Sequence, residues 1–298
     1  MADPLSEIIG LMKPRAVFSK LIGGAGSWAV RYEKFGEPSF CTMLDGECML
    51  AVDGQQPVRL QAGDFVLLPA TPGFTLSSSD TAAPTLMDPA SAKASEGEIR
   101  HGRQDGAAEM RMLGGYFAFD SPDAALLVSL LPALLHIRGA ERLKRWVQMV
   151  REESLEQRSG RELVLGRLIE ILLVEALRTT SGHDATPGLL RGLADPRLST
   201  AIRHMHAEPA HPWTVSELAA KAALSRSAFF GRFSRGVGLT PMGYLLAWRM
   251  ALAKNLLRQN KLALAEIAER IGYGSASSFS TAFSRHAGVP PSAYIGLQ

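Results

Sequence analysis

The sequence predicts an α+β protein with several domains: a β-barrel or β-sandwich at the N-terminal end, a helical bridge and an all-α C-terminal region. Short apolar runs separated by Gly, Pro and Asp turns predict the strands. Apolar residues at helical spacing predict the bridge, and two similar helix-turn-helix patterns predict the C-terminal region. A chain of 298 residues is long enough for two separate hydrophobic cores.

Five short runs in the N-terminal part predict the strands. The dipeptide Asp45-Gly46 lies between two alternating runs, which is typical of a two-residue β-hairpin. In that hairpin Cys48 would lie opposite Met43 and diagonal to Cys41 on the same face. The runs are 27–32, 39–44, 47–53, 58–60 and 65–68.

The next segment, residues 77–109, is rich in Ser, Ala, Asp and Gly and predicts a mobile loop, followed by a returning strand at 111–119. Helices are then predicted at about 124–135, 141–156 and 162–179. One face of the third helix is expected in the core. Its opposite side is also apolar, at Val164, Leu168 and Ile171, which leaves a dimer contact open. Residues 182–192 predict a linker.

Two helix-turn-helix patterns follow, at 215–235 and 264–285. Each has a short helix, a tight turn and a second helix with a Phe-x-x-x-Phe pair, and in such a unit the second helix can enter the major groove of DNA. Thr214 and Glu217 form a capping box at the start of the first pattern. A leading helix is predicted at 196–208, and a long helix at 241–259 would be a stiff strut between the two patterns.

Charge is distributed unevenly along the chain. Residues 195–298 contain 12 Lys/Arg and 5 Asp/Glu, a net charge of +7, whereas the whole chain carries +3 and the first 194 residues therefore carry −4. This asymmetry is typical of a nucleic-acid-binding end joined to a region with another role. No apolar run approaches the ~18 residues of a membrane helix, and we expect no export signal. Two cysteines suit a reducing cytoplasm.

The C-terminal hundred residues resemble the AraC/XylS family of bacterial transcription regulators. The matching segments are Trp-Thr-Val-x-x-Leu-Ala at 213–219, Leu-Ser-Arg-Ser-x-Phe at 224–229, Gly-Leu-Thr-Pro-Met at 238–242, Trp-Arg at 248–249, Ile-Ala at 267–268, Ile-Gly-Tyr at 271–273 and Gly-Val-Pro-Pro-x-x-Tyr at 288–294. Residues 1–120 are similar to the cupin-type (jelly-roll) sensor domain of one branch of that family, through Gly46 and the segments 52–54, 57–60 and 62–69.

The resemblance implies which side chains contact DNA. The positions that would face bases are Ser227, Phe230 and Gly231 in the first pattern and Ser277, Ser278 and Thr281 in the second. None is Arg, Gln or Asn, so modest base readout per contact is expected, with Phe230 placed to contact a thymine methyl group. The arginines available for phosphates are Arg226, Arg232, Arg235 and Arg285.

Catalysis is not indicated. None of the seven histidines falls between residues 15 and 78, and related sensors often have histidines where this chain has Cys41 and Phe74. A lone Cys41 with carboxylates would be a poor site for a first-row metal. There is no Gly-x-Ser-x-Gly, phosphate loop or dinucleotide fingerprint. We therefore assign no catalytic residue, no metal and no cofactor.

Two hypotheses remain for sensing in the N-terminal region. A small organic effector could bind inside the barrel, with candidate lining residues Trp28, Tyr32, Phe40 and Phe65. Alternatively, Cys41 and Cys48 could respond to oxidants or electrophiles. Plain core packing is the simplest interpretation for each of these side chains.

Together these observations predict a cytoplasmic, homodimeric transcription regulator that binds promoter DNA. Its regions would be a sensor at 1–120, a helical bridge and candidate dimerisation region at 121–182, and a DNA-binding domain at 195–298. RNA polymerase is a further candidate partner. The alternatives are a metal-dependent cupin enzyme fused to a DNA-binding domain, and an architectural DNA binder. The effector, the operator and the choice between activator and repressor stay open.

Overall fold

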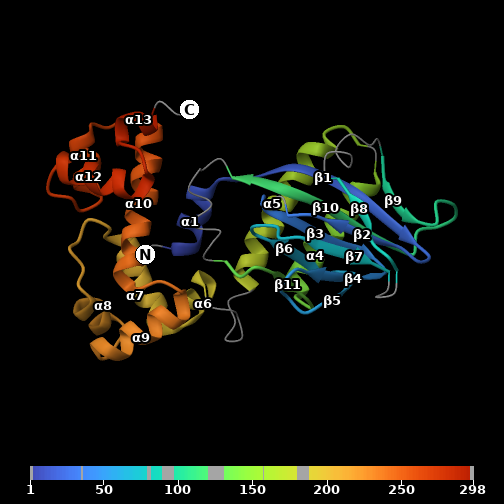
Figure 1. Cartoon of the computed structure of the whole chain (residues 1–298), viewed down its shortest axis with the longest axis horizontal. Helices are drawn as coiled ribbons and strands as arrows, with labels where there is room; N and C mark the ends of the chain where they lie inside the picture. Colours follow the sequence, from blue (N-terminus) through green and yellow to red (C-terminus); the bar gives the residue numbers. More distant parts are fainter. Residues whose placement is uncertain are drawn as a thin grey trace. The chain divides into compact units, whose positions relative to one another are not determined.

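The computed structural model describes residues 3–34, 36–78, 82–88, 97–119, 131–156, 158–179 and 188–295. The strands and two helices, α4 (Glu141–Leu155) and α5 (Arg161–Thr179), form one unit. Helix α1 (Pro4–Met12) and the C-terminal helices form the second, all-α unit (Figure 1). Within the described segments, no helix is long and apolar enough to cross a membrane.

The strands pair into two sheets. The first sheet contains β1 (Pro14–Ala25), β3 (Ser39–Asp45), β6 (Phe65–Leu68), β9 (Ile99–Gly102), β10 (Met110–Phe119) and β11 (Leu135–Ile137). Its order is β11-β6-β3-β10-β1-β9. The second sheet contains β2 (Ala29–Tyr32), β4 (Glu47–Val52), β5 (Val58–Gln61), β7 (Phe74–Ser77) and β8 (Thr85–Met87), in the order β5-β4-β7-β2-β8. Apolar side chains of both sheets meet in one core, so the predicted sandwich or barrel is confirmed.

The turn at Gly46 carries the chain from one sheet to the other. Strand β3 pairs with β10 and β6, whereas β4 pairs with β5 and β7. The hairpin expected for Asp45-Gly46 is therefore wrong, because each of its strands completes a different sheet. Gly46 has φ +69°, and a Cβ there would collide with the Glu109 carbonyl oxygen. Cys48 contacts Met43, as the hairpin would have placed it, with 3.9 Å between their sulfur atoms. The contact is between the two sheets and not between paired strands.

The first sheet is covered on both faces. Strand β6 shows this most clearly, since all four of its residues are buried. Val66 and Leu68 belong to the core between the sheets, while Phe65 stacks beside Phe40, with 6.4 Å between the ring centroids. Helices α4 and α5 pack against β3 and β1 of this sheet. Both helices agree closely with the predicted ranges 141–156 and 162–179.

Several expected connections differ from the structure. The predicted loop at 77–109 contains β8 and β9, which add parallel strands to β2 and β1. Of the helix predicted at about 124–135, residues 124–130 lie outside the described residues, and Leu135 begins β11 instead. The end of the predicted linker at 182–192 is helical, because α6 (Leu189–Ala194) buries Leu189 and Leu190.

The all-α unit contains both predicted helix-turn-helix units. Its further helices are α7 (Pro196–Ala207), α8 (Val215–Lys221), α9 (Arg226–Val237), α10 (Pro241–Gln259), α11 (Leu264–Arg270), α12 (Ala276–Ala287) and α13 (Pro291–Ile295). The capping box predicted at the start of α8 is present: Thr214 accepts a bond from the Glu217 amide, and Glu217 accepts one from the Thr214 amide. Serines cap α9 and α12, and glycines in the left-handed conformation end them.

Helix α10 contributes to the cores of both helix-turn-helix units. At one end, Tyr244 packs edge-to-face on Phe233 of α9, with centroids 5.8 Å apart. At the other end, Leu257 is buried in a cluster with Phe279 and Phe283 of α12. Nineteen residues at ~1.5 Å rise give a helix of about 28 Å. The predicted strut therefore connects the two units through packed side chains.

The two compact units do not coincide with the predicted regions, because α1, α4 and α5 belong to different units from those expected. Helix α1 packs on α7 and α10, while α4 and α5 pack on the sheet. The functional division into residues 1–120, 121–182 and 195–298 stays a prediction.

Candidate DNA-binding and effector sites

The second helix of the first helix-turn-helix unit, α9, exposes the side chains predicted to contact DNA. Phe229 and Phe233 are fully buried and anchor the helix. On other sides of the helix Arg226, Ser227 and Phe230 are exposed, and Phe230 leaves 44% of its surface open. Phe230 is one of several large apolar side chains exposed on this protein, so its exposure permits DNA contact but does not by itself indicate it.

Arg235 lies along the same face of α9, one turn beyond Gly231. A Cβ placed on Gly231 would be 3.2 Å from Nη1 of Arg235. The missing side chain of Gly231 therefore leaves the space in which this guanidinium lies. A planar five-donor group is thereby held beside a position that the resemblance aligns with base readout.

Arg232 is oriented by a carboxylate. Its Nε donates to Oδ2 of Asp195 at 2.5 Å, while Oδ1 of Asp195 accepts the amide protons of Arg197 and Leu198 and so caps α7. The Arg232 guanidinium and the backbone amides lower the pKa of Asp195, although burial acts in the opposite direction. Arg232 therefore has one fixed partner within the protein.

The corresponding helix of the second unit, α12, presents hydroxyl groups. Ser277, Ser278 and Thr281 are all exposed. Ser278 donates its hydroxyl proton to the Ser275 carbonyl oxygen at 2.9 Å, and Thr281 donates to the Ser277 carbonyl oxygen at 3.0 Å. Ser278 Oγ also accepts the Ser275 hydroxyl proton at 3.1 Å, so Ser278 keeps one lone pair for an outside donor, whereas both lone pairs of Thr281 are available.

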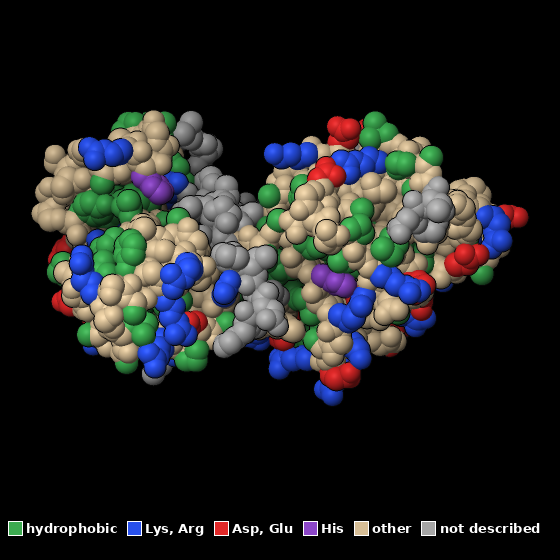
Figure 2. Space-filling view, turned by 60° about the horizontal axis from the view of Figure 1, so that its bottom comes forward, with side chains coloured by type: hydrophobic (Ala, Val, Ile, Leu, Met, Phe, Trp, Pro, Cys, Tyr) green, Lys and Arg blue, Asp and Glu red, His purple; other side chains and the backbone are tan. Residues whose placement is uncertain are grey.

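The visible face of the all-α unit in Figure 2 carries basic side chains, with few acidic ones among them. Arg285 of α12 is exposed, as are the arginines of α9. The basic side chains attract the phosphates of nucleic acid, and the few acidic side chains repel them only weakly.

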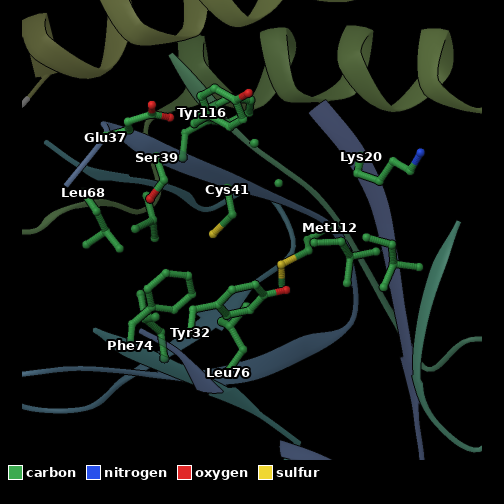
Figure 3. A pocket seen from close by; sticks show the side chains of 17 residues that line it. Lys20, Tyr32, Glu37, Ser39, Cys41, Leu68, Phe74, Leu76, Met112 and Tyr116 are labelled. Carbon is green, nitrogen blue, oxygen red and sulfur yellow. The ribbon is translucent and has the colours of Figure 1, made fainter. Parts of the chain in front are cut away.

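A cavity of about 290 Å³ lies inside the strand unit. Its walls are mainly apolar, from both sheets, and include Leu50, Leu76 and Met112. Tyr32 and Phe74 stack on each other at one side, with ring centroids 4.8 Å apart. Figure 3 shows Glu37 and Tyr116 at the other side and Cys41 between these groups. The cavity is therefore a mainly apolar chamber with Glu37 and Tyr116 on one side, and Lys20 also belongs to its lining.

The structure places two of the four predicted aromatic residues at this cavity. Tyr32 and Phe40 line it, whereas Phe65 is buried beside Phe40, and Trp28 stacks on His101 in the core. The lining residues that the sequence did not reveal come from strands of both sheets, and β10 contributes the most, including Met112. The sequence predicts strand β10, but its inward face cannot be assigned without its neighbours β1 and β3.

The two thiols differ in position. Cys41 lines the cavity, while Cys48 is buried in the core against Met43, and neither forms a disulfide. Burial, with a smaller contribution from Asp64, raises the pKa of Cys41 to about 12. Burial also raises the pKa of Cys48, and the neighbouring Cys41 adds to this. Both groups are thus held as neutral thiols, which are poor nucleophiles.

The donor set does not fit the metal site that cupin folds often carry. Within the described residues there is no cluster of three or more His, Cys, Asp or Glu side chains with metal-binding geometry. His101 stacks on Trp28, and His136 is bonded to Asp64 at 2.9 Å, so the two nearby histidines are used in packing and ion pairing. A His/His/carboxylate centre is not formed by these residues.

Comparisons with known proteins agree with both halves of this description. Residues 3–182 match the family model described as Cupin, and residues 218–296 match the model described as Helix-turn-helix domain. The chain is 36% identical to a putative AraC-like transcription regulator of Streptomyces antibioticus, over 98% of each chain. It is 25% identical to the RCS-specific HTH-type transcriptional activator RclR of Escherichia coli, over 98% of this chain and 96% of that one.

The chain belongs to the AraC family of transcription regulators. The family resemblance predicted from the C-terminal motifs is thereby confirmed, and so is the cupin-type N-terminal domain. Members of this family bind DNA through the helix-turn-helix region, which here comprises α8–α9 and α11–α12 joined by α10. The DNA contacts of individual side chains and the effector are taken up below as proposals.

Proposed function

We propose that this AraC-family regulator places α9 and α12 in successive major grooves and responds to a small, largely apolar effector bound inside its cupin domain. The observation that carries the DNA part is the arrangement of the two helices on α10. Each is anchored by a buried Phe pair and exposes polar or aromatic side chains elsewhere. Major grooves on one face of B-DNA recur every ~34 Å, and a packed strut of about 28 Å is long enough to hold two helices at a separation of this order.

The two helices would contact DNA differently. Exposed Phe230 fits the methyl group of a thymine, whereas the outward lone pairs of Ser278 and Thr281 fit amino groups of adenine or cytosine. Duplexes selected by the full-length protein from a randomised library test this. We expect two conserved blocks about one helical turn apart, with a thymine preference in one block that is lost in Phe230→Ala. A single block that survives substitutions on α12 would contradict the proposal.

The effector part rests on the cavity of about 290 Å³. Its apolar walls would enclose a hydrocarbon or aromatic body, and Glu37 and Tyr116 at one end would meet a polar group of the ligand. An amphipathic small molecule therefore fits better than a sugar, whose hydroxyls would need polar partners on all sides.

Cys41 offers a matched pair of variants that separates effector binding from thiol sensing. Cys41→Ala removes the thiol and leaves the cavity open, while Cys41→Phe removes the thiol and fills the cavity. A thermal-shift screen of small amphipathic compounds should yield ligands that stabilise the wild type and Cys41→Ala but not Cys41→Phe. Loss of the regulatory response in both variants would favour thiol sensing instead.

We propose no enzymatic activity, because similar proteins over the full chain are transcription regulators and the residues that the structure describes form no metal-binding cluster. Dimerisation is proposed through α5, where Leu163 and Val164 are exposed, although Leu168, predicted on the same side, is buried. Sedimentation of the full-length protein tests this: Val164→Asp should give a monomer, and an unchanged dimer would place the contact elsewhere. RNA polymerase stays a candidate partner.

A further inference from the structure

A small basic cavity lies beside the first helix-turn-helix unit, at the junction of α6, α7 and α9. Its volume is about 230 Å³, and its charged lining consists of Arg191, Arg232, Arg235 and Asp195. Arg191 belongs to α6, which precedes the segment 218–296 matched as helix-turn-helix. Neither the family match nor the sequence patterns therefore assign Arg191 a role.

Helix α6 is fixed against α9. The Gly188 amide donates to the Gly236 carbonyl oxygen at 2.9 Å, and Gly192 of α6 is buried. A Cβ on Gly192 would collide with Val237 of α9. The short helix therefore approaches α9 closely, which sets Arg191 beside the arginines of α9.

The charge of the cavity is unbalanced. Its single carboxylate, Asp195, is used by Arg232 and by the N-terminal amides of α7. Among the residues that the structure describes, Arg191 and Arg235 have no carboxylate partner. Three guanidinium groups and one carboxylate leave a net charge of about +2 around a space large enough for one phosphate group.

The cavity also lies on a side of α9 from which it could contact the DNA backbone. Phe229, Phe233, Gly236 and Val237 form the buried face of α9. At ~100° per residue, Gly231 and Arg235 lie on the opposite face, and Arg232 lies on the flank toward Asp195. When α9 occupies a major groove, that flank faces one of the two sugar-phosphate backbones.

We propose that Arg191, Arg232 and Arg235 together bind one phosphodiester of the DNA backbone at the edge of the groove that α9 enters. Helix α6 thereby extends the DNA interface beyond the helix-turn-helix unit, and Asp195 is a positioning residue that holds Arg232 in place. The inference rests on the proposed DNA contact of α9. A single phosphate contact adds affinity for every sequence and fixes the register of α9 without reading a base.

The test uses the full-length protein and a duplex that the wild type selects from a randomised library. Arg191→Ala should weaken binding roughly tenfold at 0.1 M salt and lower the slope of log K against log salt by up to about 0.9, the value for complete loss of one phosphate contact, because Arg232 and Arg235 remain at the cavity. Base preference should be unchanged. Arg203→Ala is the matched control, because it removes an exposed arginine of α7 that does not line the cavity. Arg191→Lys should recover part of the affinity.

Neutral methylphosphonates placed singly along the duplex locate the contact. One position should cost the wild type at least the factor that Arg191→Ala costs, and that cost should be smaller in the variant, where only Arg232 and Arg235 remain. Thermal unfolding of each variant confirms that the helices are folded. An unchanged salt slope in Arg191→Ala, an equal change in Arg203→Ala, or additive losses from methylphosphonate and variant at every position would overturn the proposal.

A free phosphate ion is the other source of the same chemistry. Measurements with and without inorganic phosphate, at constant ionic strength, distinguish a free phosphate ion from a DNA phosphodiester. If the wild type and Arg191→Ala bind the duplex equally in phosphate-free buffer, and millimolar phosphate stabilises only the wild type against unfolding, the cavity holds a free anion and the backbone assignment is wrong. A wild type that selects no duplex would refute the proposed DNA contact itself, whereas normal selection with an inert Arg191 refutes only this inference.

Discussion

The Arg235 guanidinium occupies the space that Gly231 leaves open, with 3.2 Å between its Nη1 atom and the position that a Cβ on residue 231 would take. The glycine lies within the twelve-residue helix α9, where it lowers helix stability by roughly 1 kcal/mol relative to alanine. Gly231 lies at the proposed recognition surface. Its presence there, despite the lower helix stability, is explained if DNA binding requires a residue without a side chain.

Gly231→Ala should therefore separate stability from DNA affinity. The alanine should stabilise the all-α unit by up to about 1 kcal/mol, because it favours the helix. It should also weaken DNA binding modestly, because the new methyl group crowds the Arg235 guanidinium and shifts it slightly from this position. Thermal unfolding and duplex titration measure the two effects. In an Arg235→Ala background the affinity loss should disappear, and an equal loss in both backgrounds would contradict this explanation.

Neighbouring phenylalanines on α9 should have opposite roles. Phe229 is fully buried, so Phe229→Ala should cost about 3–5 kcal/mol of unfolding free energy. Phe230 is 44% exposed, so Phe230→Ala should change stability by less than about 0.5 kcal/mol while weakening selection for its duplex. Denaturant unfolding and DNA binding of the two variants provide the comparison. A large stability loss in Phe230→Ala would show that its ring has a packing role.

The stability of the all-α unit should fall as the solution becomes acidic. Burial lowers the pKa of His206 below its usual value near 6.5, although Glu7 partly offsets this. The folded state therefore binds a proton less readily than the unfolded state, so the stabilising contribution is present above about pH 6.5 and is lost as pH falls further. Unfolding temperatures between pH 7.5 and 5 should show this decline.

A glutamine in place of His206 should flatten that pH dependence, because it keeps hydrogen-bonding capacity without titrating. His286→Gln, on the exposed surface of α12, is the control and should leave the profile unchanged. If the profile of His206→Gln is as steep as that of the wild type, another group governs the acid sensitivity.

Both thiols should react slowly in the folded protein. With the pKa of Cys41 raised to about 12, the thiolate fraction at pH 7.5 is roughly a thousandfold smaller than for a free cysteine. Alkylation by iodoacetamide, followed by mass spectrometry, should be slow at pH 7.5 and should accelerate about tenfold per pH unit. The unfolded protein should react at once. Fast labelling of folded Cys41 at neutral pH would instead favour the thiol-sensing hypothesis.

The helical half could be predicted closely because its signals are local. The cap at Thr214, the Phe-x-x-x-Phe pairs and the glycines that end α9 and α12 lie within a few residues of the turns they specify. Such signals act before any tertiary contact forms. The recognition residues came from the family resemblance, and their DNA contacts stay a prediction, although Ser227, Phe230 and Thr281 are exposed in the structure.

The strand half was harder to predict because pairing is not local. The Asp45-Gly46 signal is compatible both with a hairpin and with a turn that leads to a second sheet, and only the partners β10 and β7 decide between them. Strand β1 has glycines and charged residues in place of clear alternation, so its twelve residues carry no strand signal. For the same reason the cavity wall on β10 and the position of Arg191 became visible only in three dimensions.

The hydrogen bond between Glu7 and His206 joins residues 199 positions apart, and it ties the first helix of the chain to its third quarter. Helix α1 is translated before the strands, whereas its docking surface on α7 and α10 is translated only after them. The sandwich is thus an insertion within a discontinuous helical body. A protein shortened to its last hundred residues would lack α1. The surface around His206 and Tyr244, which α1 covers in the full chain, would then be exposed to solvent.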